Sequence, residues 1–317
     1  MKSIENQLLK KTLTNYVSLD TIHPMNRLLG IFLIVVSAAS FGTLAIIGRY
    51  AYADGLDVTT MLFLRFTIAA ILMFAWLAIR KEPLPRGRTL LQLAGMGGLG
   101  YVGQSFCFMS AINYASTGLV ALLLYLYPVF VTLLTVIFQK VKLTSRTIIA
   151  LVLATVGAAL TANPQGGQLP GILLAISAAV IYAVYILVGT GVMQKVSAVQ
   201  SSAVIFASAA LVFGVMTAIR GPHWPATQNG WLAISGIAVI ATLLPVATFL
   251  GGLKIIGATD ASLLSTLEPV VTVVLAAMLL GEQVQPLMLA GGVLILAAVL
   301  LIVRQPKKNP VVETASP

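Results

Sequence analysis

Ten long apolar segments, separated by short polar connections, make up most of the chain. They lie at about residues 28–49, 58–79, 90–112, 117–138, 145–162, 170–191, 199–219, 231–252, 260–281 and 285–303. Most approach the roughly 20 residues that an α-helix needs to cross about 30 Å of hydrocarbon. The connections are too short to hold a soluble catalytic domain. The pattern therefore predicts an all-α polytopic membrane protein with ten transmembrane helices.

Composition and charge agree with this interpretation. Hydrophobic residues make up 59% of the 317 residues and charged residues only 9%, and a soluble chain of this length could not bury so much apolar surface. The net charge is +10, but no basic helix or aromatic-basic module lies outside the apolar segments, so we expect no nucleic-acid binding. The single cysteine, Cys107, excludes an internal disulfide, and we expect no metal and no cofactor.

The basic residues predict the orientation in the membrane. If the N-terminus is cytoplasmic, the inside segments hold 16 Lys and Arg residues, whereas the outside loops hold only Arg220. This bias places both termini, the tails 1–27 and 304–317, in the cytoplasm. We expect a multi-pass protein of a bacterial cell inner membrane.

The chain contains a sequence repeat. Residues 115–129, ASTGLVALLLYLYPV, resemble residues 257–270, GATDASLLSTLEPV, if one inserted residue is allowed. Pro128 then aligns with Pro269, and Tyr127 with Glu268. Two units of five spans, at residues 28–162 and 169–303, must insert in opposite directions because five is odd. Inverted repeats of this kind place a substrate site near the membrane midplane, between the halves.

Glu268 and Pro269 lie together near the middle of the ninth span. A charge at that depth costs several kcal/mol unless it is protonated or paired, and the proline frees the carbonyl of Ser265 from its helical hydrogen bond. Pro128 marks the equivalent point of the first repeat. At Pro245 we expect a simple kink in the eighth span, the alternative being local unwinding.

Several polar or aromatic residues fall near the bilayer centre when depth is counted at about 1.5 Å per residue. They are Ser40, Tyr101, Gln104, Tyr127, Tyr182, Thr242 and Glu268. We expect them to line one cavity, the alternative for each tyrosine being ordinary packing. Arg65 either bridges toward Glu268 or extends outward to interfacial water. Residues 95–100 match GxGxxG, but no strand precedes them, so we interpret these glycines as a site of close helix packing.

Further motifs resemble a known family. They are LEPV at 267–270, Gly281-Glu282, Gly291-Gly292, the PVF after Tyr127 and the arginine within the second span, Arg65. Together they are similar to the EamA-like family of the drug/metabolite transporter superfamily over residues 28–303. The first repeat departs from the pattern, because Lys140-Val141-Lys142 stands where an acidic residue would follow the fourth span. The resemblance implies a secondary transporter that exports a small metabolite, amino acid or drug by alternating access.

The expected partners are a small-molecule substrate, the lipid bilayer and protons, and the chain would act as a monomer or weak homodimer. The candidate substrate-binding residues are Ser40, Arg65, Tyr101, Gln104, Tyr127, Tyr182, Thr242, Ser265 and Glu268. Glu268 is also the candidate proton carrier, against the alternative of a permanently paired structural carboxylate. Two other functions stay open, a membrane-embedded lipid-modifying enzyme and a membrane subunit of a larger transport complex. The chain has few His, Asp or Glu residues, which argues against the enzyme, and it has no long cytoplasmic loop, which argues against the subunit.

Overall fold

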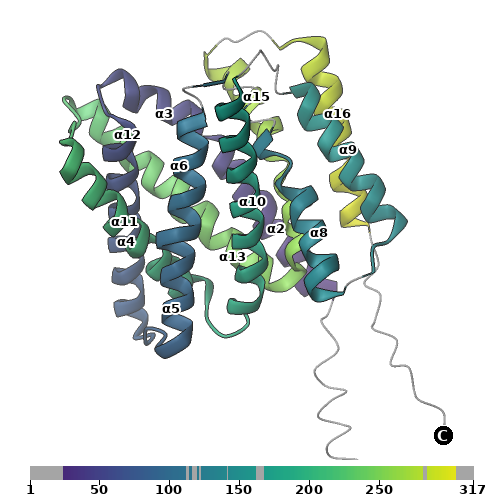
Figure 1. Ribbon diagram of the computed structural model, residues 1–317, viewed down its shortest axis with the longest axis horizontal. Helices are drawn as coiled ribbons and strands as arrows, with labels where there is room; N and C mark the ends of the chain where they lie inside the picture. The colour runs from purple at the N-terminus through teal and green to yellow at the C-terminus, as the bar shows by residue number, and fades with distance from the viewer. Residues whose placement is uncertain are drawn as a thin grey trace, which may run out of the picture.

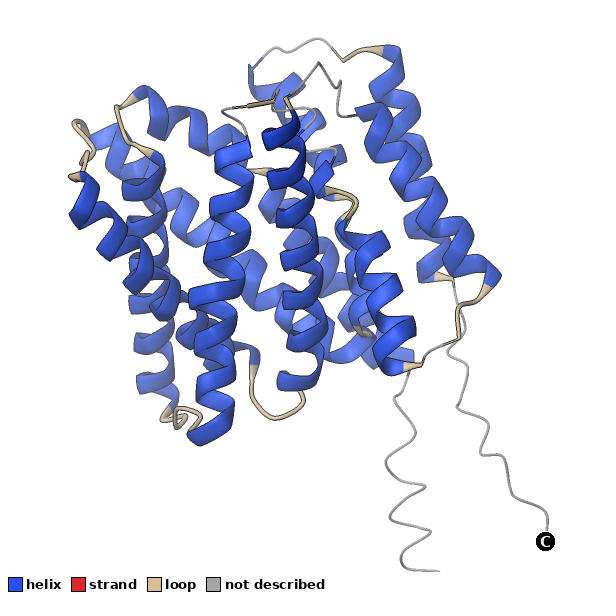
Figure 2. Ribbon diagram, viewed as in Figure 1, coloured by secondary structure: helices blue, strands red, loops and turns tan. Residues whose placement is uncertain are grey.

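The structure is a bundle of α-helices (Figures 1 and 2). This computed structural model describes residues 24–111, 114–115, 120, 123–140, 142–161, 168–280 and 284–304, and no β-strand occurs among them. The predicted tails beyond these residues and the Gly281-Glu282 pair lie outside the described part. The helices are α2 (Pro24–Gly42), α3 (Leu44–Ala53), α4 (Val58–Arg80), α5 (Gly87–Gly95), η1 (Met96–Tyr101), α6 (Val102–Ala111), α8 (Tyr127–Gln139), α9 (Ser145–Thr161), α10 (Leu169–Val192), α11 (Ala198–Arg220), α12 (Gln228–Ala238), η2 (Val239–Leu243), α13 (Leu244–Ile256), α14 (Ala258–Ser265), α15 (Glu268–Leu280) and α16 (Pro286–Val303).

These helices build the ten predicted spans. Seven continuous helical stretches of the described chain are long and apolar enough to cross a membrane, and two shorter apolar helices cover 127–139 and 145–160. The third span is assembled from α5, η1 and α6. The prediction of an all-α polytopic membrane protein is confirmed.

The contacts between helices map onto one another when the two repeats are exchanged. In the first repeat α2 packs on α13 of the second, and in the second repeat the equivalent helix α10 packs on α6 of the first. The second span of each repeat packs on its counterpart, α4 on α11, and the fifth spans pair likewise, α9 on α16. Contacts that map onto themselves in this way, between units of five spans, confirm the inverted repeat.

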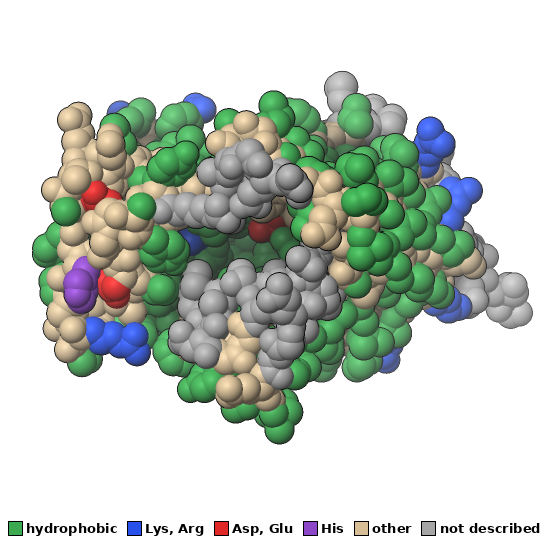
Figure 3. Space-filling view, turned by 90° about the horizontal axis from the view of Figure 1, so that it is seen from above, with side chains coloured by type: hydrophobic (Ala, Val, Ile, Leu, Met, Phe, Trp, Pro, Cys, Tyr) green, Lys and Arg blue, Asp and Glu red, His purple; other side chains and the backbone are tan. Residues whose placement is uncertain are grey.

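Both ends of the described chain lie on one side of the bundle. The guanidinium of Arg27, near the start of α2, donates to the carbonyls of Ile302 (2.7 Å) and Val303 (3.0 Å) at the end of α16. We call this side the terminal side; it is the lower side of Figure 1, and Figure 3 looks at the opposite side.

Glycines bring helices of the two halves into close contact. A Cβ on Gly97 of η1 would overlap the carbonyl oxygen of Ile205 on α11. A Cβ on Gly157 of α9 would lie 2.7 Å from the carbonyl oxygen of Gly291 on α16. The interpretation of residues 95–100 as a site of close helix packing is therefore correct at Gly97.

Several spans are interrupted near their middle, which the sequence predicted only in part. α14 ends at Ser265 and α15 begins at Glu268, so the interruption lies just before Pro269. Across this break the amide of Leu267 donates to the carbonyl of Leu264 at 3.1 Å, and Leu126 donates to Leu123 at 3.3 Å before α8. The fourth spans of both repeats are thus broken at equivalent residues.

The eighth span corrects the expectation of a simple kink at Pro245. A π-helical turn, η2, occupies the five residues just before α13, and Pro245 lies in the first turn of α13. There the hydroxyl of Thr242 donates to the carbonyl of Ile237, five residues earlier, at 2.8 Å. The third span carries the equivalent π-helical turn, η1, without any proline, so the turn belongs to the repeat and not to Pro245 alone. Such turns are frequent at functional sites.

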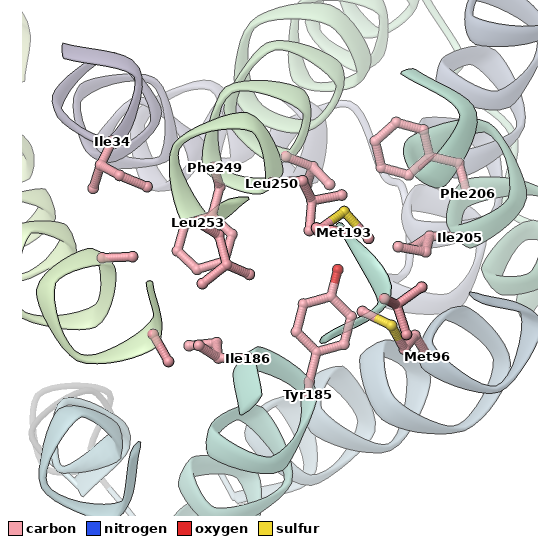
Figure 4. Packing of buried hydrophobic residues seen from close by; sticks show 14 of the residues in the cluster. Ile34, Met96, Tyr185, Ile186, Met193, Ile205, Phe206, Phe249, Leu250 and Leu253 are labelled. Carbon is pink, nitrogen blue, oxygen red and sulfur yellow. The ribbon is translucent and has the colours of Figure 1, made fainter. Parts of the chain in front are cut away.

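An apolar core holds side chains from both halves, and Figure 4 shows part of it. Ile34 of α2 and Leu250 and Leu253 of α13 meet Ile186 of α10 there, and all four side chains are buried. Leu253 lies near the terminal-side end of its helix. The two halves are therefore packed against each other on this side.

Candidate functional site

The opposite side of the bundle is hollowed. The space-filling view from that side shows the hollow, with acidic and basic side chains visible inside it (Figure 3). Arg65 of α4 lies well inside its helix, and Glu268 opens α15 in the middle of the ninth span. Both charges thus lie within membrane-spanning segments, away from the ends of their spans.

Glu268 lies at the break between α14 and α15 and keeps part of its surface accessible. Among the described residues no basic side chain forms an ion pair with it. Its electrostatic neighbours are the hydroxyls of Tyr101, Tyr125, Tyr127 and Tyr182. The structure therefore gives no support to a permanently paired carboxylate.

α2 passes close to the same break. A Cβ on Gly42, the last residue of α2, would lie 3.1 Å from the carbonyl oxygen of Glu268. The carbonyl of Gly42 also accepts a hydrogen bond from the Thr272 hydroxyl at 3.1 Å. Because α2 itself ends there and α3 begins at Leu44, the interruptions of the first and ninth spans adjoin.

Four tyrosines form a continuous row of ring contacts, which we call the tyrosine wall: Tyr101, Tyr185, Tyr182 and Tyr127. The ring centroids of Tyr101 and Tyr185 lie 5.8 Å apart, those of Tyr185 and Tyr182 6.0 Å, and those of Tyr182 and Tyr127 4.8 Å. The contacts are mostly edge-to-face, the arrangement that aromatic pairs prefer. The wall joins η1, α10 and α8, so it spans both repeats.

Tyr127 fastens the wall to the broken ninth span. Its hydroxyl donates to the carbonyl of Ser262 on α14 at 3.2 Å, and its side chain is 2% exposed. The side chain of Ser265 lies within hydrogen-bonding reach of the same hydroxyl. In the first repeat Tyr127 thus stands at the position that Glu268 occupies in the second, and reaches across to the second.

Arg65 is buried, with only 4% of its surface exposed. Its guanidinium lies within hydrogen-bonding reach of the Tyr101 hydroxyl and 4.7 Å from the ring centre of Phe66. The alternative in which Arg65 extends outward to interfacial water is therefore wrong, and the alternative of a bridge to Glu268 shows no ion pair among the described residues. Tyr101 interacts electrostatically with both charges, so it links them.

The remaining candidates differ in what their polar atoms contact. Thr242 is fully buried, and its hydroxyl already donates within its own helix. The hydroxyl of Ser265 likewise donates to Ala261, at 2.9 Å. Gln104 is partly exposed, and Ser40 is buried two residues before Gly42. The structure brings Tyr101, Tyr127, Tyr182 and Glu268 together, whereas Thr242 and Ser265 form hydrogen bonds within their own helices.

Sequence reasoning missed two tyrosines near the site. Tyr185 belongs to the tyrosine wall, and Tyr125 lies within electrostatic range of Glu268. Tyr185 follows Tyr182 by three residues on α10, so it lies on the same helix face. That spacing could have identified it. Tyr125 lies in the turn before α8, where helical spacing gives no guide.

A cluster of hydrogen bonds joins loops on the same side of the bundle as the hollow. Asp54 accepts from the Thr227 hydroxyl (2.6 Å) and from the amides of Thr227 (3.1 Å) and Ala226 (2.8 Å). These bonds lower the pKa of Asp54. Partial burial acts to raise the pKa of Asp57, but hydrogen bonds from Thr59 and Thr60 lower it overall. Asp54 thus fastens the loop before α12, in the second repeat, to the loop after α3, in the first.

The comparison with known proteins agrees with this architecture. The family description of the EamA-like transporter family matches residues 28–163 and 169–304, one copy for each half. This chain belongs to the EamA-like transporter family. A transporter named as uncharacterized from Archaeoglobus fulgidus is 28% identical over 274 residues, covering 86% of this chain and 95% of its own length. The inner membrane transporter YedA of Escherichia coli, also named as uncharacterized, is 26% identical over 268 residues, covering 80% of this chain and 86% of its own.

A solved crystal structure shares the fold of this EamA-like chain. It superposes with a TM-score of 0.74 at 21% identity and covers 86% of this chain and 95% of that one. The family and its named relatives indicate a transporter and not an enzyme. They name no substrate.

Proposed function

We propose that this protein is a secondary transporter that exports a small organic metabolite by alternating access, with Glu268 as the proton carrier. The observation that carries the proposal is the state of Glu268. It is a partly accessible carboxylate without a basic partner among the described residues, at the break of a membrane-spanning helix. A carboxylate that is desolvated favours its protonated form, and one that meets water can release the proton.

The packing supports access from one side at a time. On the terminal side, Arg27 forms an ion pair with Asp260 at 3.4 Å, and the Ser197 hydroxyl donates to Glu82 at 3.1 Å. These contacts close the terminal side, while the opposite side is hollowed (Figure 3). We orient the terminal side to the cytoplasm, since the Lys and Arg residues concentrate there. This arrangement then corresponds to an outward-open state.

Rocking of the halves would change the access of Glu268 to water. In the outward-open state Glu268 takes a proton from outside, and in the inward-open state it releases the proton inside while the substrate moves outward. The interrupted fourth and ninth spans would supply the flexible points, because the broken backbone there carries fewer helical hydrogen bonds.

The test uses the full chain. The exported solute is first identified by comparing extracellular metabolites of cells with and without the protein. Uptake of that solute is then measured in proteoliposomes without ATP, with and without a pH gradient. Glu268→Gln keeps size and hydrogen bonding but cannot ionise, so we expect it to lose accumulation driven by the pH gradient and to keep exchange.

The matched control is Glu313→Gln, which removes a carboxylate from the predicted C-terminal tail, outside the spans. It should keep accumulation and its pH dependence. Accumulation against a gradient by Glu268→Gln, with unchanged pH dependence, would show that Glu268 carries no proton. A requirement for ATP would contradict the secondary transporter itself.

A further inference from the structure

Arg65 lacks a counter-ion among the described residues. Arg65 is 4% exposed, and its Nε has no hydrogen-bond partner among the described residues. No described carboxylate forms an ion pair with it. A buried charge is costly unless it is paired, and a guanidinium is rarely kept inside a protein with one of its donors unused.

We propose that Arg65 binds the carboxylate of the transported solute, and that the apolar or aromatic body of the solute lies against the tyrosine wall. This inference rests on the proposed function. The transported molecules would then be small monocarboxylates with an apolar body, with or without an amino group.

The partners that Arg65 has are weaker than an anion. Tyr101 offers a neutral hydroxyl, and Phe66 offers the face of its ring at 4.7 Å. Hydrogen bonds with an ionised donor or acceptor are roughly twice as strong as neutral ones, and with a carboxylate both the donor and the acceptor would be ionised. The planar fork of a guanidinium also matches a carboxylate with two parallel hydrogen bonds. The unused Nε is one of the donors that such a pair needs.

Charge and shape favour a carboxylate over a phosphate. Within the described membrane-spanning part, Arg65 is the cation beside the tyrosine wall, and one cation balances a monoanion and not a dianion. The Tyr101 hydroxyl at Arg65 begins the wall, and the ring contacts lead from there to Tyr127 beside the broken ninth span. An anion held at Arg65 would therefore place an apolar body along aromatic faces, as small-molecule sites require.

Glu268 lies at the other end of this arrangement. Tyr101 interacts electrostatically with both Arg65 and Glu268, yet the two charges form no ion pair. In this proposal, a molecule held at Arg65 by its carboxylate extends along the tyrosine wall toward Glu268. An amino group at the other end would face Glu268, and the test below asks whether it is needed.

The experiment measures ligand-induced thermal stabilisation of the purified full chain. The probes are matched pairs of a carboxylate and its primary amide, at millimolar concentration: benzoate and benzamide, 3-phenylpropionate and its amide, phenylalanine and phenylalaninamide. We expect at least one carboxylate to raise the melting temperature and its amide to do so at least about tenfold more weakly. A difference between phenylpropionate and phenylalanine reports whether the amine contributes.

Three variants assign the effect. Arg65→Gln should remove the preference for carboxylates, and Arg65→Lys should keep only part of it, because a single ammonium cannot form the two-pronged contact. Arg80→Gln removes a positive charge from the exposed end of the same helix, where its guanidinium lies over Trp76, and should leave the preference intact. Without ligand, Arg65→Gln should melt no lower than the wild type, since it removes a buried unpaired charge.

Each result decides the matter. Equal stabilisation by acids and amides, no stabilisation by any carboxylate, or an unchanged preference in Arg65→Gln would overturn the assignment. A large loss of unliganded stability in Arg65→Gln would instead make Arg65 a structural residue. Transport of a neutral solute by the wild type, together with any of these, would leave the transporter proposal standing. Carboxylate binding without any transport would support the assignment of Arg65 and contradict the transporter proposal.

Discussion

Replacing Gly97 by alanine tests how the third span is placed. A Cβ at this position would overlap the carbonyl oxygen of Ile205 and lie 2.9 Å from the Ile205 Cα. Carbon atoms prefer about 3.5–4.0 Å, so η1 and α11 would have to separate by roughly 0.6–1 Å. Overpacking of this kind typically costs about 1–3 kcal/mol.

A matched control isolates the packing effect. Gly95 lies two residues earlier in the same span, and a Cβ there would meet nothing within 4 Å. Both substitutions gain the same helix propensity, about 1 kcal/mol. The difference between Gly97→Ala and Gly95→Ala therefore reports the cost of the overlap, and we expect Gly97→Ala to be less stable by about 1–3 kcal/mol.

The measurement is the apparent melting temperature of both variants in the same detergent, with transport as a second readout. Gly97→Ala should melt several degrees below Gly95→Ala. Because the clash is with the backbone of Ile205, a smaller side chain there should not rescue it. Transport should also fall, since Tyr101 closes η1 and would move with it. Equal melting temperatures would show that η1 and α11 do not approach as described.

Other predictions follow from single contacts. Hydrogen bonds lower the pKa of Asp54, so the stability that they supply should be present above the ordinary carboxyl pKa of about 3.9 and be lost as the pH falls below it; Asp54→Asn should lack this acid-sensitive part in melting curves between pH 7 and 3. Tyr127→Phe removes the bond to the Ser262 carbonyl and should cost about 0.5–1.5 kcal/mol. Tyr185→Phe should cost less, because its buried hydroxyl has no partner among the described residues. Reporters fused at Asp54 and Arg86 should read outside and inside respectively, and the reverse would contradict our orientation.

The fold could be predicted from the sequence because lipid restricts the options so strongly. A span of about 20 apolar residues has to be helical, since a helix satisfies its own backbone hydrogen bonds. The predicted second span, 58–79, differs from α4, Val58–Arg80, by a single residue at its end. The two similar segments around Pro128 and Pro269 likewise predicted the repeat. A proline before an apolar run is unusual, so its second occurrence was easy to recognise.

The interior of the site was harder to predict, because the depth of a residue in the membrane does not show which way its side chain points. Thr242 and Tyr101 come out at a similar depth, yet the Thr242 hydroxyl bonds within its own helix and Tyr101 meets Arg65. The π-helical turns decide this, because an extra residue in a turn rotates every side chain that follows. The local sequence of η1 did not predict its π-helical turn, because η1 contains no proline.

The equivalent positions Tyr127 and Glu268 show how two similar halves perform different tasks. Both follow a break in the fourth span of their repeat, and both precede a proline. Tyr127 is buried and donates to the other half, so it holds the halves together in this state. Glu268 is partly accessible and has no basic partner among the described residues, which is why we propose it as the proton carrier. If both positions held acids, two carboxylates at the break would repel each other whenever both were ionised. With one phenol and one carboxylate, the proposed cycle moves at most one proton through this pair of positions, and the phenol keeps the broken spans in contact while it does so.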